Sequence, residues 1–122
     1  MSFRKENLEH CTAVYVETDK LNATISPELK KMFTDSMEEG KSSNLVLDIS
    51  ACKYCDSSGL SAILVGHRAT KNSNGLLVVN GASDMVEKLI HLSKLDSILS
   101  LTPTFPEALD LVMMHEIEKG FE

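Results

Sequence analysis

The residues best suited to chemistry in this sequence form one short stretch: Asp56, Ser57, Ser58, Gly59 and Leu60. The stretch lies between a predicted strand and a predicted helix, and open α/β sheets usually place their sites at the carboxyl ends of strands. A serine at a helix start points its hydroxyl past free backbone N–H groups, which can hold a phosphate beside the positive end of the helix dipole. Phosphorylation there would add about −1.5 to −2 charges next to Asp56 and could repel a partner that the unmodified serine accepts.

The same stretch also has a purely structural interpretation. Asp and Ser are preferred helix caps, because their side-chain oxygens accept from the first free N–H groups. Spacing alone therefore leaves a helix cap and a phosphorylation switch both open. Catalysis by Ser58 is not indicated, because the G-x-S-x-G turn of a nucleophile elbow is missing. The histidines are also scattered along the chain, at His10, His67, His91 and His115.

Cys52 and Cys55 form a C-x-x-C pair in the same loop, which is also the pattern of a thioredoxin-like redox site. A redox thiol gains acidity at a helix N-terminus, whereas here Asp56 and the serines take that place and the carboxylate opposes thiolate formation. A zinc site would need a second pair of ligands, which Cys11 beside His10 supplies only in part. We expect ordinary half-buried cysteines and no metal, and we keep a redox function as an alternative.

Composition restricts the class of partner. A chain of 122 residues, 43% of them hydrophobic, is long enough for a single domain over residues 1–122 with one core. A net charge of −6 argues against nucleic acid, because counterion release needs clustered Lys and Arg. The absence of a signal peptide or long apolar run predicts no membrane span, and three cysteines favour a reducing, cytoplasmic compartment. No glycine-rich nucleotide loop is present, so we expect no cofactor and assign ATP to a partner.

Apolar periodicity predicts alternating strands and helices. The predicted strands cover residues 12–18, 21–25, 45–49, 76–80 and 98–101, and the third is expected at the centre of the sheet because it is short, largely apolar and β-branched on part of its length. The predicted helices begin at Ser26, Ser58, Asp84 and Thr104. This order selects an α/β domain with a largely parallel sheet.

Several local features follow from the same pattern. The hydroxyl of Ser26 is expected to cap the first helix, and Gly40 to end it in a left-handed conformation. Two capping boxes are predicted, at Asp84 with Glu87 and at Thr104 with Glu107. Methionines at helical spacing are expected to fill the core, namely Met32, Met85 and Met113. The acidic residues of the tail, 116–122, are expected to be solvated.

The strand at 45–49, the Asp56 to Leu60 stretch and the helix through Ile63 and Leu64 together resemble the signature region of STAS domains. The double serine resembles the form found in bacterial anti-sigma factor antagonists. The similarity in element order extends across nearly the whole chain, up to the closing helix from Thr104. It implies a STAS-like α/β fold, with a mixed, largely parallel sheet of four or five strands and about four helices.

The resemblance also implies a mechanism. An anti-sigma factor that is itself a serine kinase would phosphorylate the second serine, Ser58, with Ser57 the lesser candidate and Asp56 and Gly59 shaping the site. The unphosphorylated protein, not an enzyme, would bind that kinase so that the sigma factor is released, and a serine/threonine phosphatase would reset it. The C-x-x-C loop departs from the family, which more often has an apolar residue before the Asp. The other alternative is a constitutive scaffold, a STAS subunit of a lipid transporter or a sensory complex, in which the serine only caps the helix.

Overall fold

The computed structural model describes residues 2–120 and contains a five-stranded mixed sheet in the order β1-β2-β4-β6-β7. Only β1 runs antiparallel to its neighbour. The strands of this sheet are β1 (Phe3–Asn7), β2 (Thr12–Val16), β4 (Leu45–Asp48), β6 (Leu77–Asn80) and β7 (Ser100–Thr102). A separate parallel pair joins β3 (Lys20–Leu21) to β5 (Tyr54–Cys55).

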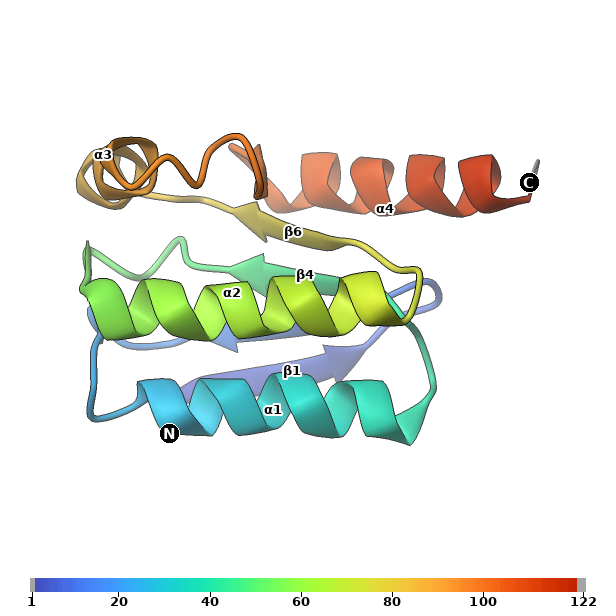
Figure 1. Cartoon of the computed structure of the whole chain (residues 1–122), viewed down its shortest axis with the longest axis horizontal. Helices are drawn as coiled ribbons and strands as arrows, with labels where there is room; N and C mark the ends of the chain where they lie inside the picture. The colour runs from blue at the N-terminus through green and yellow to red at the C-terminus, as the bar shows by residue number, and fades with distance from the viewer. Residues whose placement is uncertain (1, 121–122) are drawn as a thin grey trace.

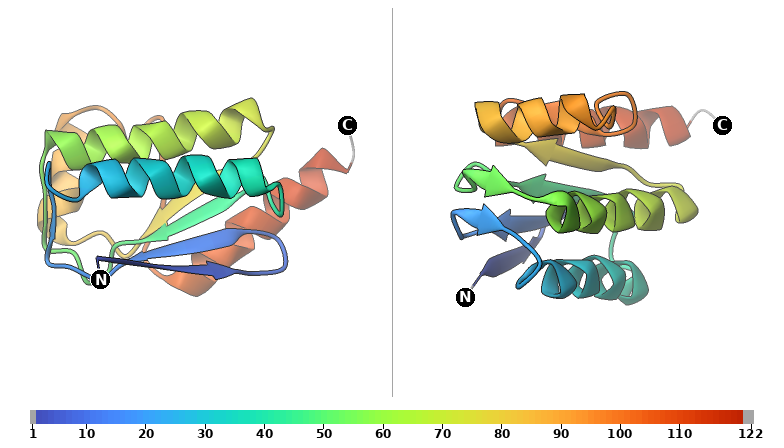
Figure 2. Two further views of the ribbon diagram at one scale, coloured as in Figure 1. Left: turned by 90° about the horizontal axis from the view of Figure 1, so that it is seen from below. Right: turned by 60° about the vertical axis from the view of Figure 1, so that its left-hand side comes forward.

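Within the described residues four helices complete the predicted α/β fold: α1 (Ser26–Glu39), α2 (Ser57–Asn72), α3 (Asp84–Leu92) and α4 (Phe105–Lys119). Helices α1 and α2 lie side by side on one face of the sheet, and α4 crosses the other (Figures 1 and 2). The larger core cluster joins the first face to α1, α2 and α3, and a smaller one lies under α4. The strand predicted to be central, β4, is the middle strand of the five.

The strands differ from prediction at several places: β2 ends at Val16 rather than at residue 18, and the two-residue β5 was not predicted. Strand β1 was not predicted, because only Phe3 of its five residues is buried and no alternation marks it. The strand predicted over residues 21–25 is only two residues long, because the chain turns at Asn22, whose carbonyl accepts from the N–H groups of Ile25 and Ser26. The last strand begins at Ser100, since residues 98 and 99 still donate to the carbonyl of Leu95 in a turn.

Two of the predicted helix caps are wrong. The hydroxyl of Ser26 does not accept from the start of α1; it is buried and donates to the carbonyl oxygen of Asn22 at 2.6 Å. Helix α3 is capped by Ser83, whose hydroxyl accepts from the N–H of Val86 at 3.3 Å, so Asp84 is the first helical residue rather than the cap. In both cases the chain enters the helix one residue away from where residue preference alone placed the cap.

The other two predicted helix ends agree with the structure. The Thr104 hydroxyl accepts from the N–H of Glu107 at 3.4 Å and donates to its carboxylate at 2.7 Å, so this pair caps α4. Gly40 ends α1 with φ of 70°, in the left-handed region. Both helix ends are set by residues that are close together in the sequence. The local sequence pattern was therefore enough to predict them.

The methionine prediction is confirmed for one residue of three. Met32 is half-buried against the main core, but Met85 and Met113 are 61% and 41% exposed. Helices α3 and α4 each bury a narrow stripe, so methionines outside that stripe face solvent. The acidic tail is not uniformly solvated either, since Glu116 is half-buried and bonded. Residues 121 and 122 of that tail lie outside the described residues.

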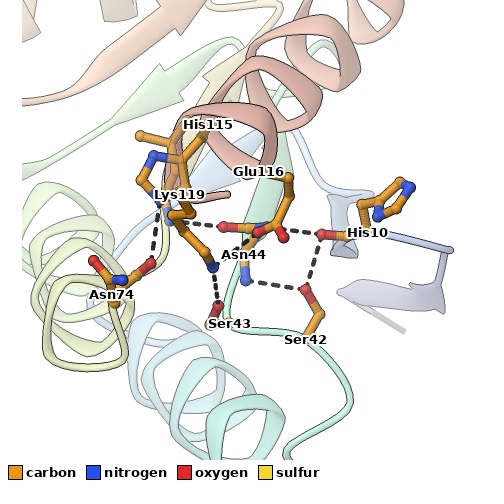
Figure 3. Close-up of polar contacts among 9 residues, drawn as sticks. His10, Ser42, Ser43, Asn44, Asn74, His115, Glu116 and Lys119 are labelled. Carbon is orange, nitrogen blue, oxygen red and sulfur yellow. Dashed lines mark hydrogen bonds and ion pairs between the residues drawn. The ribbon is translucent and has the colours of Figure 1, made fainter. Parts of the chain in front are cut away.

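A polar network fastens α4 to the amino ends of the central strands (Figure 3). The buried amide of Asn44 donates to the carbonyl of His10 at 2.9 Å and to the carboxylate of Glu116 at 2.7 Å, and its oxygen accepts from the N–H of Leu76 at 2.9 Å. The amide of Asn44 and the ammonium of Lys119 together hold the pKa of Glu116 below its usual range. This end of the sheet is therefore closed by structural contacts, and the serine stretch lies at the opposite end.

Candidate functional site

Asp56, not a serine, caps α2. Its Oδ1 accepts from the backbone N–H groups of Ser58 at 2.9 Å and Gly59 at 3.0 Å, and from the Ser58 hydroxyl at 2.5 Å. The helix accordingly begins at Ser57, one residue earlier than predicted, and both serines lie inside its first turn. The serines are therefore not needed as caps.

The same hydrogen bonds set the charge of the site. The Ser58 hydroxyl, followed by the N–H of Gly59, holds the pKa of Asp56 below its ordinary value, because each donor favours the ionised carboxylate. The N–H groups that we expected to be free for a phosphate are already occupied by this carboxylate. A phosphate on Ser58 would thus meet a negative charge at its nearest neighbour.

Close packing beneath the helix fixes the position of the serines. The N–H of Asp56 donates to the carbonyl of Leu21 in β3 at 3.2 Å, which joins the start of α2 to the β3–β5 pair. Gly59 is buried against the same pair, and a Cβ there would lie 2.6 Å from Cys55 Sγ and 2.7 Å from the Leu21 carbonyl oxygen. Only glycine, which has no Cβ, allows the start of α2 to pack this closely against the β3–β5 pair. The sequence did not reveal this role.

The four predicted site residues differ in exposure. Ser57 is exposed and Ser58 and Asp56 are half-buried, whereas Gly59 is buried. The structure thus brings all four together at the carboxyl edge of the sheet.

An open groove of about 420 Å³ borders Ser57, and sequence reasoning missed it. Its lining comes from β5, the start of α2 and one side of α3: Tyr54, Cys55, Asp56, Ser57, Met85, Lys88, Leu89 and Leu92. These elements are far apart in sequence, so no local pattern could have indicated the groove. The one available signal was the apolar spacing of Met85, Leu89 and Leu92, which is equally typical of a helix face that packs on the core.

The cysteines of the loop, which we expected to be half-buried, are fully buried thiols. Cys52 Sγ donates to the carbonyl of Tyr54 at 3.0 Å, and Cys55 Sγ donates to that of Asp56 at 3.4 Å. Burial raises the pKa of Cys55 to about 12 and also raises that of Cys52. Because the thiolate is the reactive form, these environments oppose redox chemistry. Within residues 2–120, no three His, Cys, Asp or Glu side chains gather as a metal site.

Comparison with known families assigns the fold. The model of the STAS domain matches residues 3–108, which is most of the chain. This chain belongs to the STAS domain family. Of the four helices in the described part of this STAS domain, none is long and apolar enough to cross a membrane.

Solved structures similar to this STAS domain include anti-sigma factor antagonists. One, tm1081 of Thermotoga maritima, is 24% identical with a TM-score of 0.80, over 91% of this chain and 94% of that one. An anti-sigma factor antagonist from Mycobacterium paratuberculosis is also 24% identical, with a TM-score of 0.74 over 91% and 92% of the two chains. Unphosphorylated SpoIIAA is 16% identical, with a TM-score of 0.72 over 91% and 97%. At these identities the likeness establishes the common fold.

Proposed function

We propose that this chain is an anti-sigma factor antagonist, a non-enzymatic cytoplasmic protein that binds an anti-sigma factor kinase while Ser58 is unmodified. Phosphorylation of Ser58 releases the kinase, and a serine/threonine phosphatase restores binding. The observation that carries the proposal is the half-buried Ser58 at the carboxyl edge of the sheet, whose hydroxyl donates to the Asp56 carboxylate at 2.5 Å. The similar fold of SpoIIAA, which is known in unphosphorylated and phosphorylated forms, supports it.

The switch operates through charge. Phosphorylation removes the hydroxyl proton that now bonds Asp56 and places about −1.5 to −2 charges beside that carboxylate. The combined negative charge repels an acidic or apolar partner surface without requiring a change of fold. Ser57 is the lesser acceptor; it is exposed, but within residues 2–120 its hydroxyl has no hydrogen bond that would orient it.

The scaffold alternative gains no support from the site. In that alternative the serine serves only as the helix cap, whereas the structure gives this task to Asp56. The Ser58 hydroxyl donates to the capping carboxylate and is not itself the cap. The serine is therefore better explained as an acceptor.

Phosphate mapping tests the proposal. The protein is incubated with ATP and a candidate anti-sigma factor kinase from the same organism, and the modified residue is located by mass spectrometry. We expect phosphate on Ser58, and Ser58→Ala should abolish it. Ser61→Ala is the matched control, because Ser61 is exposed one turn along the same helix. Absence of phosphate from both Ser57 and Ser58 would refute the proposal.

Calorimetry tests the charge mechanism. Ser58→Ala should bind the kinase as tightly as the wild type but cannot be switched off, whereas Ser58→Asp should bind at least tenfold more weakly because it adds a charge beside Asp56. Ser61→Asp adds the same charge elsewhere on α2 and should have little effect. Equal affinity of wild type, Ser58→Ala and Ser58→Asp would contradict repulsion as the mechanism.

A further inference from the structure

Helix α3 carries an apolar stripe that folding uses only in part, since Leu89 packs against the main core while Met85 and Leu92 are largely exposed. Its buried side consists of Val86 and Ile90, which belong to the main core. On another side Met85, Leu89 and Leu92 follow one another at helical spacing, and Met85 and Leu92 are 61% and 69% exposed. A surface helix normally has one apolar face, and a second one that is exposed and contiguous marks an interaction surface.

This stripe forms one wall of the groove that borders the phosphorylation stretch. The opposite wall is Tyr54 of β5, which is 44% exposed, together with Asp56 and Ser57. Ser57, the neighbour of Ser58 in the chain, lines the groove, so a protein that covers both serines also meets the groove. The stripe on α3 therefore lies next to the phosphorylation stretch. The exposed methionines of α4 do not, because α4 crosses the opposite face of the sheet (Figure 2).

The charge of the groove indicates the chemistry of its occupant. Lys88 lines it, is exposed, and within residues 2–120 has no ion pair. The Asp56 carboxylate on the other side is already satisfied by its own helix. The groove therefore has a cation, Lys88, on the α3 side and an anion, Asp56, on the other, in a mostly apolar surround.

We propose that this groove is the docking site of the anti-sigma factor kinase, which inserts an apolar segment carrying an acidic residue opposite Lys88. The inference rests on the proposed function and adds the surface that supplies affinity. Apolar contact with Met85 and Leu92 holds the kinase, and the charge state of the neighbouring serine decides whether it stays. A phosphate at the edge of the groove repels the acidic residue of the segment and keeps water at the apolar contact, so that one modification opposes both parts of the attachment.

Paired substitutions test the docking site. Met85→Asp should raise the Kd for the kinase tenfold or more, and should raise the KM for Ser58 phosphorylation while kcat stays near the wild-type value. Met114→Asp is the matched control, since it puts the same charge at a methionine 55% exposed on α4, and should change neither constant more than twofold. Leu92→Asp provides a second variant, and Lys88→Glu should weaken binding in the same direction.

The outcomes separate the inference from the function on which it rests. Unchanged Kd and KM in both Met85→Asp and Leu92→Asp would overturn the docking site, even though phosphate on Ser58 of the wild type would still support the function. No binding and no phosphorylation of the wild type would overturn the function itself. A dimer in sedimentation that Met85→Asp dissociates, with kinase affinity unchanged, would assign the groove to a second copy and also overturn the inference.

Discussion

Replacing Gly59 by alanine tests whether the serines are held where packing places them. The added Cβ would lie 2.6 Å from Cys55 Sγ and 2.7 Å from the carbonyl oxygen of Leu21, both closer than real contacts allow. The carbonyl belongs to a backbone that is itself paired with β5, so it cannot simply turn aside. The start of α2 must therefore move away from β3, and Ser58 with it.

The expected loss of stability follows from two opposing effects. Forcing an extra methyl group into packed surroundings costs about 1–3 kcal/mol. Alanine recovers about 0.5–1 kcal/mol of helix propensity relative to glycine. The free energy of unfolding should therefore fall by about 0.5–2 kcal/mol, which for a domain of this size lowers the Tm by roughly 2–8 °C.

Urea unfolding followed by circular dichroism measures this loss, since the chain contains no tryptophan. Ser61→Ala, at an exposed position of the same helix, is the control and should be neutral or slightly stabilising. In a Cys55→Ala background the cost of Gly59→Ala should be smaller but not zero, because the sulfur contact is relieved while the Leu21 carbonyl remains. A Gly59→Ala protein as stable as the wild type would refute the role of packing.

Acid sensitivity and thiol reactivity give two further predictions. The folded protein holds the pKa values of Asp56 and Glu116 below their ordinary ones, so stability present at neutral pH should be lost as pH falls below about 5 and these groups protonate. Urea unfolding at several pH values measures this loss of stability. Glu116→Gln should make the free energy of unfolding depend less on pH, and the same pH dependence in wild type and variant would contradict the prediction. Native protein at pH 8 should react with a thiol reagent far more slowly than unfolded protein, because burial raises the pKa of Cys55 to about 12 and of Cys11 to about 11. A Cys52–Cys55 disulfide formed readily under mild oxidation would instead support redox function.

Much of the fold could be predicted because its central strands are covered on both faces. Strands β4 and β6 are short apolar runs with turn residues around them, a pattern typical of buried parallel strands. Strand β1 lacks it, because an edge strand with four exposed residues is held by its pairing with β2 rather than by its own composition. The two-residue strand β3 exists only because β5, more than thirty positions later, lies beside it.

The candidate site could be located from the sequence, but the role of each residue within it could not be assigned. Asp56, Ser57 and Ser58 are all good capping residues, so residue type alone could not say which of them caps α2. That choice depends on where the chain leaves β5, since the N–H of Asp56 is tied to Leu21 and its side chain is thereby turned toward the helix. The groove depends in the same way on the packing of α3 beside β5, a contact between distant segments.

The identity of the cap changes how a phosphate at this site must act. With a serine cap, a phosphate could have settled on the free N–H groups of α2 and been stabilised by them. With Asp56 on those N–H groups, the phosphate gains no such contact and instead lies beside an ionised carboxylate. The added charge is then directed outward, toward whatever covers Ser58 and the groove beside it. Phosphorylation of Ser58 would thus remove a hydrogen bond from the cap of α2 and add charge beside it, and under the proposed function the bound kinase would meet that charge.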